Sequence, residues 1–139
     1  MKINVINRLL IAIIIFTTIY MFTNQVNEHF NKQNPYLIEC VNEVKEHFPK
    51  VNELRFYEGD ESYTLNKEKV YICVKDKKTN ELYDKNILKY VILHEYAHSI
   101  CPEIGHTPLY QKIFNKVLTE AVDKGVYDPN VKIPINYCK

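Results

Sequence analysis

Residues 86–98 read Asn86-Ile87-Leu88-Lys89-Tyr90-Val91-Ile92-Leu93-His94-Glu95-Tyr96-Ala97-His98. The first eight are apolar on nearly every face, which predicts a helix that is buried on most sides. Positions four apart lie on one face of a helix, so the imidazoles of His94 and His98 can bind one metal ion. Glu95 is next to them, where its carboxylate can take a proton from a water held in an open coordination position. The stretch therefore predicts a catalytic Zn2+ site.

The expected burial of this helix favours a metal site more strongly than the short motif alone would. Two histidines and a glutamate on a buried helix need polar partners, because an unsatisfied buried ionisable group costs several kcal/mol. A metal ion satisfies all three side chains at once. The alternative is that the two imidazoles simply form hydrogen bonds with neighbouring carbonyl groups.

Catalytic zinc usually has three protein ligands and one water, so a third ligand is expected downstream. Cys101-Pro102 ends the helix, and Thr107-Pro108 is typical of the N-cap and first position of the next one. His106 lies just before that start, after a glycine that permits a tight backbone approach, and is the predicted third ligand. Glu103, in the same turn, and Glu120, on the following helix, are the alternatives.

The motif from His94 to His98, the Gly105-His106 pair and the helix that starts at Pro108 resemble the core of the SprT/WLM-type zinc metallopeptidases, small relatives of the gluzincins. The resemblance covers roughly residues 35–125, and only the metal motif within it is specific. Seven residues separate His98 from His106, whereas the WLM pattern has five, so the subfamily stays open. The resemblance implies cleavage of proteins, in some members of proteins crosslinked to DNA.

We therefore expect a zinc metallopeptidase of the HExxH type in which His94, His98 and His106 bind the metal and Glu95 activates its water. The expected substrate is a protein or peptide near the same membrane. The main alternative is a non-catalytic, membrane-anchored scaffold with a structural zinc, or a module that binds peptides without cleaving them. The sequence leaves the oligomeric state open.

The N-terminal part reads as a membrane segment. Residues 9–22 are continuously apolar, and the neighbouring apolar residues bring the length near that of a span. No small-residue cleavage site follows, which favours an uncleaved signal anchor over residues 1–26. We expect a linker, or a frayed extension of the anchor helix, over 27–34 and the catalytic domain over 35–139. Lys2 and Arg8 precede the apolar run, so the N-terminus is expected in the cytosol and the catalytic domain on the opposite side.

The remaining pattern predicts an α+β fold. Asn34 and Pro35 begin a helix that ends before Pro49, and short strands are expected over 54–57, 63–65 and 69–74. We expect a small antiparallel sheet packed against the HExxH helix and two supporting helices. The strand Lys69–Val74 is nominated as an edge strand that could pair with an extended substrate, as in the families that the chain resembles. A central position for it is the alternative.

A helix is predicted from Pro108 to Lys124, with Gly125 as a left-handed cap and an apolar stripe that starts at Leu109. Three tyrosines, Tyr110, Tyr127 and Tyr137, are candidates for stabilising the oxyanion of a tetrahedral intermediate, although each also suits a packing role.

Charge and cysteine content give weaker information. The 18 basic residues nearly balance the 17 acidic ones, so nothing points to a nucleic-acid surface. The four cysteines, Cys40, Cys73, Cys101 and Cys138, allow three pairings; Cys40 and Cys73 suit small buried side chains, and a disulfide involving Cys101 or Cys138 is expected if the domain lies in a lumen. The lysine- and asparagine-rich composition resembles small proteins of large DNA viruses in style only.

Overall fold

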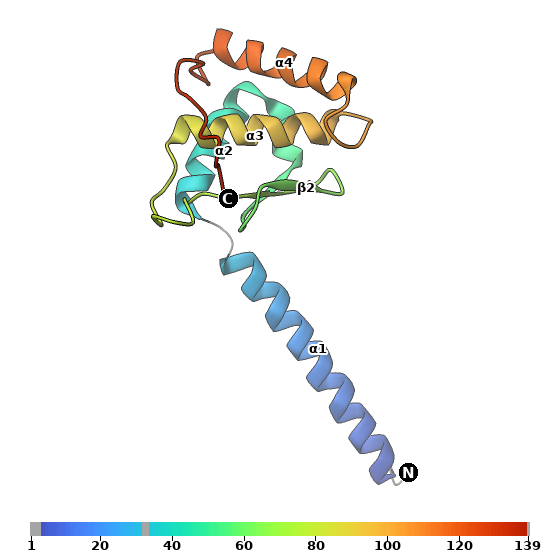
Figure 1. Cartoon of the computed structure of the whole chain (residues 1–139). Helices are drawn as coiled ribbons and strands as arrows, with labels where there is room; N and C mark the ends of the chain where they lie inside the picture. Colours follow the sequence, from blue (N-terminus) through green and yellow to red (C-terminus); the bar gives the residue numbers. More distant parts are fainter. Residues whose placement is uncertain (1–3, 32–33, 139) are drawn as a thin grey trace. The chain divides into compact units, whose positions relative to one another are not determined.

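The structure is a computed structural model that describes residues 4–31 and 34–138. The chain forms two compact units, Met1–Lys32 and Gln33–Lys139. In the first unit, helix α1 (Val5–Asn31) includes a stretch, Val5–Val26, that is long and apolar enough to cross a membrane (Figure 1). The segment predicted as a linker or as an extension of the anchor helix is helical as far as Asn31, because residues 24–31 contain no proline or glycine that would end the helix. Its residues 32 and 33 lie outside the described part.

The second unit begins with helix α2 (Pro35–His47), followed by a short 3-10 helix, η1 (Pro49–Glu53). The predicted cap is confirmed: the side-chain oxygen of Asn34 accepts a hydrogen bond of 2.9 Å from the backbone N–H of Tyr36. The buried side of α2 consists of Leu37, Cys40, Val41 and Val44. His47 lies in the last turn of α2, away from the histidine cluster found among the described residues.

The sheet has the strand order β1-β3-β2, formed by β1 (Arg55–Glu58), β2 (Tyr63–Leu65) and β3 (Lys69–Ile72). The α+β class is confirmed, but the sheet is mixed, because β3 runs parallel to β1 and antiparallel to β2. The connection 59–62 leaves room for one strand between β1 and β2. The tight hairpin after β2 then places β3 in that position, between the other two strands. β3 is therefore central, and its nomination as an edge strand was wrong; β2 is the edge strand beside α3.

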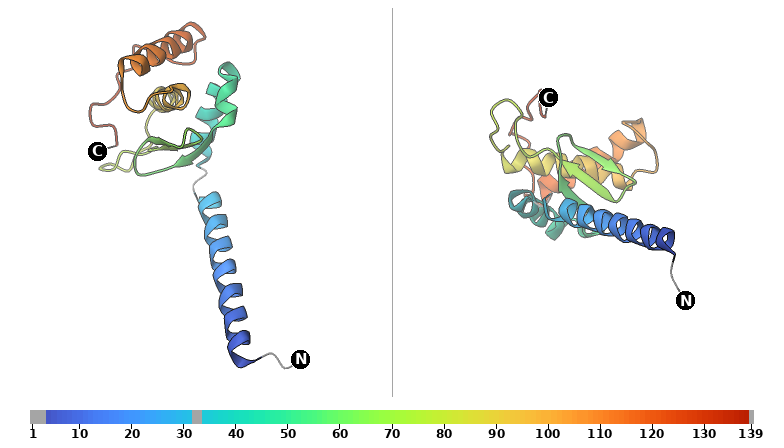
Figure 2. Two further views of the ribbon diagram at one scale, coloured as in Figure 1. Left: turned by 90° about the vertical axis from the view of Figure 1, so that its right-hand side faces the viewer. Right: turned by 90° about the horizontal axis from the view of Figure 1, so that it is seen from below.

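Helix α3 (Lys85–Ile100) lies between α4 (Pro108–Asp123) and the sheet, and α2 packs against it as well (Figures 1 and 2). Asp84 caps α3 by accepting a hydrogen bond from the backbone N–H of Asn86. The prediction of a helix buried on most sides is confirmed: the buried residues of α3 are Ile87, Leu88, Val91, Ile92, Leu93, Glu95, Tyr96 and Ala97.

Helix α4 starts and ends where the sequence predicts, within one residue. The Thr107 hydroxyl accepts a hydrogen bond of 3.2 Å from the backbone N–H of Tyr110, and Gly125 has a φ of +69°, the left-handed conformation expected of a C-terminal cap. Leu109 was wrongly placed in the buried stripe. It is exposed, because the fully buried side chain of Tyr110 takes the inward position of the first turn.

A disulfide joins Cys73, just after β3, to Cys138 near the C-terminus. Cys73 was expected only to pack as a small buried side chain, but it also forms this bond. Cys40 and Cys101 are buried free thiols. The hydroxyl of Tyr137 donates a hydrogen bond to the Cys73 carbonyl, so two neighbouring contacts hold the C-terminal segment against the sheet.

Candidate metal centre

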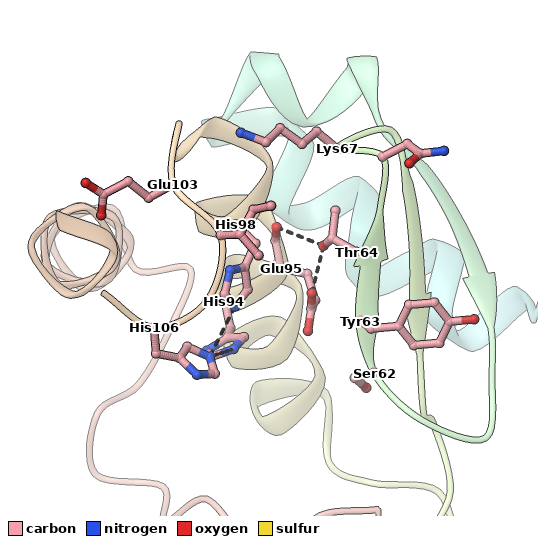
Figure 3. A pocket seen from close by; sticks show the side chains of 12 residues that line it. Ser62, Tyr63, Thr64, Lys67, His94, Glu95, His98, Glu103 and His106 are labelled. Atoms are coloured by element: carbon pink, nitrogen blue, oxygen red, sulfur yellow. Dashed lines mark hydrogen bonds between the residues drawn. The ribbon is translucent and has the colours of Figure 1, made fainter. Parts of the chain in front are cut away.

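Three imidazoles converge beside the sheet. His94 and His98 project from one face of α3, and His106 comes from the connection between α3 and α4 (Figure 3). Nε2 of His106 lies 3.1 Å from Nε2 of His94 and 3.1 Å from Nε2 of His98. The three predicted ligands are therefore brought together, one ligand atom from each within 4.8 Å of the others.

This spacing fits a tetrahedral zinc ion. Zinc–nitrogen bonds of about 2.0–2.1 Å place neighbouring ligand nitrogens about 3.3 Å apart, close to the separation seen here. Hydrogen bonds among these three Nε2 atoms would satisfy them poorly, because each nitrogen of a neutral imidazole is either a donor or an acceptor and the two contacts of His106 Nε2 would have to share one proton or one lone pair. Three histidines, with no fourth protein ligand in the cluster among the described residues, match the donor set that catalytic zinc sites use.

The alternative third ligands lie elsewhere. Glu120 forms an ion pair of 2.6 Å with Lys124 on the same helix, where it is partly exposed. Glu103 lines the pocket in front of the histidines but does not belong to the cluster. Gly105 has a φ of +83°, a conformation that a side chain would strain, and Thr107 caps the following helix. His106 is placed between these two fixed points.

The hydroxyl of Tyr110 contacts His94, one of the three predicted ligands. Its hydroxyl oxygen lies 2.9 Å from Nδ1 of His94 and 3.3 Å from the carbonyl oxygen of His94. If the hydroxyl donates to that carbonyl, its oxygen is free to accept a hydrogen bond from Nδ1–H. The proton on Nδ1 leaves Nε2 with a free lone pair toward the cluster, which is the tautomer that a metal ligand requires.

The protonation of the ligands also suits a metal. Burial, reinforced by His98 and then His106, lowers the pKa of His94 from 6.5 to about 4. The pKa of His98 is lowered as well, by burial and by His106. Both side chains therefore favour the neutral form, which is the form that binds zinc.

Glu95 lies between the three histidines and strand β2. It is 4% exposed, and its Oε2 accepts a hydrogen bond of 2.7 Å from the hydroxyl of Thr64 (Figure 3). Burial raises its pKa to about 7, and the hydrogen bond from Thr64 acts in the opposite direction. The bond fixes one carboxylate oxygen and leaves the other available for a proton transfer.

A pocket of about 500 Å3 opens in front of Glu95 and the three histidines. One wall is the edge strand β2 with its flanking residues, and the other is the connection that carries His106. Ile104 on that connection is 93% exposed. The edge strand β2 therefore lies along one side of the pocket.

Two contacts of the candidate site were not predicted from the sequence. Thr64 was predicted only as a strand residue. Tyr110 was one of three tyrosines considered either as an oxyanion donor or as a packing residue, and its buried hydroxyl lies against His94. Tyr137 contacts Cys73 and lies 3.1 Å from the hydroxyl of Ser62, and Tyr127 is a buried packing residue. The period of α4 could have indicated an inward Tyr110; nothing in the sequence indicates which strand residue faces Glu95.

Similar proteins are found in large DNA viruses. The chain is 44% identical over 87 residues to Uncharacterized protein 042R of Invertebrate iridescent virus 3, covering 63% of this chain and 55% of the relative. It is 43% identical over 88 residues to Uncharacterized protein 136R of Invertebrate iridescent virus 6, covering 62% and 49%. Uncharacterized protein R325 of Acanthamoeba polyphaga mimivirus is 31% identical over 115 residues, 73% of this chain and 58% of the relative.

The chain therefore spans about half the length of the curated relatives it matches. No family model matches the chain, and no solved structure matches it. The names of these relatives state no activity.

Proposed function

We propose that this protein is a zinc-dependent metallopeptidase. The observation that carries the proposal is the convergence of three histidine Nε2 atoms, 3.1 Å apart in two of the pairs, beside a buried glutamate that is not itself a ligand. His94, His98 and His106 would hold the ion. Zinc bound there would supply a Lewis acid that polarises the scissile carbonyl and lowers the pKa of a water.

Glu95 would be the general base. Its carboxylate, held through one oxygen by Thr64, takes a proton from the attacking water and passes that proton to the leaving amine. A pKa raised by burial favours both transfers, because the group must bind the proton and then release it near neutral pH. Tyr110 keeps His94 in the ligating tautomer. The edge strand β2 would hold the substrate in extended form by backbone hydrogen bonds.

The main alternative is a scaffold with a structural zinc. Structural zinc sites have four closed protein ligands and no use for a general base. Here the described cluster offers three ligands, and the pocket in front of them is open. A buried glutamate aimed at that pocket by a hydrogen-bonded threonine also favours the enzyme over the scaffold.

We further propose that α1 anchors the enzyme in a membrane, with its N-terminus in the cytosol and the second unit on the opposite side. The length and composition of Val5–Val26 support a membrane span. The Cys73–Cys138 disulfide supports the orientation, since such bonds persist mainly outside the reducing cytosol.

The full chain, purified in detergent and loaded with zinc, would be incubated with casein and with a peptide library. We expect cleavage by the wild type and a loss of at least about a thousandfold in Glu95→Gln, with zinc content unchanged. The control is Glu103→Gln, which removes a carboxylate that lines the same pocket and should retain most of the activity. Zinc binding without cleavage by the wild type would favour the scaffold.

A further inference from the structure

The active-site pocket is bounded at one end by a lysine whose charge is unpaired by any carboxylate among the described residues. Lys67 lies in the turn that joins β2 to β3, in the same wall as Thr64. The recorded ion pairs of the described residues involve other lysines and Arg55. Figure 3 shows the side chain of Lys67 along the edge of this pocket.

The backbone of Lys67 has an unfavourable conformation in this turn. Asn66 and Lys67 have φ values of +51° and +58°, and the N–H of Glu68 donates a hydrogen bond of 3.2 Å to the carbonyl of Leu65. This is a two-residue hairpin turn in which both central residues are left-handed, and glycine is favoured at the second of them. A lysine there accepts strain that glycine would avoid.

The side chain of Lys67 reaches from the turn between β2 and β3 to the C-terminal end of α3. Nζ of Lys67 donates a hydrogen bond to the carbonyl oxygen of Cys101, the residue that follows α3. An ammonium has three donors, and this contact occupies one of them. The same side chain also lines a second hollow of about 680 Å3, with Arg55 and Ser99 among its other lining residues. Lys67 therefore stands between the two hollows.

We propose that Lys67 is a specificity residue that binds a carboxylate of the substrate, so that this pocket takes acidic peptides. A positive charge with free donors at the end of a cleft is complementary to a carboxylate. Lys67 follows Thr64 by three residues, so it lies within about 10 Å of the strand position that faces Glu95. That span is two or three residues of an extended substrate. The carboxylate is either a Glu or Asp side chain or a free C-terminus at that distance.

This inference rests on the proposed peptidase function. It is tested with peptides that carry Glu or Gln at one position in turn, each made with a free or an amidated C-terminus. The full chain should cleave one acidic member at least about tenfold faster, in kcat/KM, than its uncharged partner. A preference for Glu over Gln identifies a side chain, and a preference for the free acid over the amide identifies the C-terminus. The absence of any preference would overturn the proposal.

The variants separate recognition from support of the fold. Lys67→Met should bring the ratio of acidic to uncharged rates close to one, whereas Lys67→Arg should keep it. Lys116→Met, which removes a charge from the exposed side of α4, is the matched control and should keep the ratio as well. If Lys67→Met lowers both rates equally, so that the ratio is unchanged, the lysine only braces the turn and the proposal is wrong.

A binding experiment distinguishes this proposal from the peptidase proposal. Zinc-loaded Glu95→Gln full chain would be titrated with fluorescent forms of the same peptides. Tighter binding of the acidic member, lost in Glu95→Gln/Lys67→Met, would support the role of Lys67 even if the wild type cleaves nothing. Equal affinities for acidic and uncharged peptides would contradict it.

Discussion

The Tyr110 hydroxyl oxygen lies 2.9 Å from Nδ1 of His94. This contact connects the first turn of α4 to the middle of α3, at a point where the tyrosine is fully buried. The second contact of the hydroxyl, with the His94 carbonyl, settles which way its proton points if Nδ1 carries a proton. With the proton on Nδ1, Nε2 keeps a free lone pair toward His106, so this packing of α4 on α3 would favour the metal-binding tautomer of His94.

Tyr110→Phe should therefore weaken zinc binding while leaving the fold intact. Loss of an outer-shell partner of a ligating histidine typically lowers metal affinity about 10–100-fold. The measurement is competition for zinc with a chromophoric chelator. Tyr90→Phe is the control, because the ring of Tyr90 packs against Phe114 and Tyr127 near the same helices, and its hydroxyl forms no hydrogen bond with a histidine among the described residues. Equal affinities for the Tyr110→Phe variant and the wild type would refute the tautomer argument.

Thr64→Val should move the acidic limb of the pH–rate profile upward. The hydrogen bond from Thr64 lowers the pKa of Glu95, so its removal raises that pKa and delays formation of the carboxylate. We expect a displacement of about one pH unit in kcat/KM, since a pKa unit corresponds to about 1.4 kcal/mol and a hydrogen bond to a charged group contributes a similar amount. Thr64→Ser keeps the hydroxyl and should keep the limb in place. If the acidic limb of Thr64→Val lies at the same pH as that of the wild type, Thr64 does not lower the pKa of Glu95.

In the metal-free protein, His94 and Glu95 should change the free energy of unfolding with pH in opposite directions. The folded pKa of His94 is about 4, below its unfolded value near 6.5, so its contribution to stability is present above pH 6.5 and is lost as pH falls toward 4. The folded pKa of Glu95 is about 7, above its ordinary value of 4.5, so its contribution is lost as pH rises from 4.5 through 7.

Glu95→Gln removes the second contribution. Urea unfolding with chelator present, followed by tyrosine fluorescence, should show that the variant gains stability more steeply than the wild type from pH 4 to 6.5. After allowance for solvent screening of the partly exposed His94, the expected gain is about 1–2 kcal/mol. Parallel profiles for the two proteins would contradict the assigned pKa shifts.

Reduction of the Cys73–Cys138 disulfide should destabilise the second unit. A native disulfide that closes a long loop contributes about 2–4 kcal/mol, and this one links residues 65 positions apart. A reductant should lower the urea midpoint of the wild type but leave that of Cys138→Ser unchanged. A wild-type midpoint that is insensitive to reductant would show that the bond does not support the fold.

Local signals in the sequence predicted much of this structure. The caps Asn34 and Thr107 and the glycine Gly125 set helix ends within about a residue, because each acts through neighbouring backbone groups. The convergence of His94 and His98 follows from helical spacing alone. His106 was predictable because a helix start fixes the residue just before it.

Non-local features were not predictable in the same way. The parallel pairing of β1 with β3 depends on which gap the hairpin fills, and three short strands leave that choice open. The disulfide partner of Cys73 lies 65 residues away, and four cysteines allow three pairings. The contact of Thr64 with Glu95 joins two elements whose register only the packed structure determines.

The central claim is that three histidines hold one zinc ion, and metal analysis tests it most directly. The full chain and the variants His94→Ala, His98→Ala, His106→Ala and His47→Ala would be refolded with zinc, dialysed and assayed for zinc per chain. We predict one zinc per chain for the wild type and for His47→Ala, and a loss of tightly bound zinc in each of the other three. A wild type without zinc, or zinc retained in His106→Ala, would contradict the account.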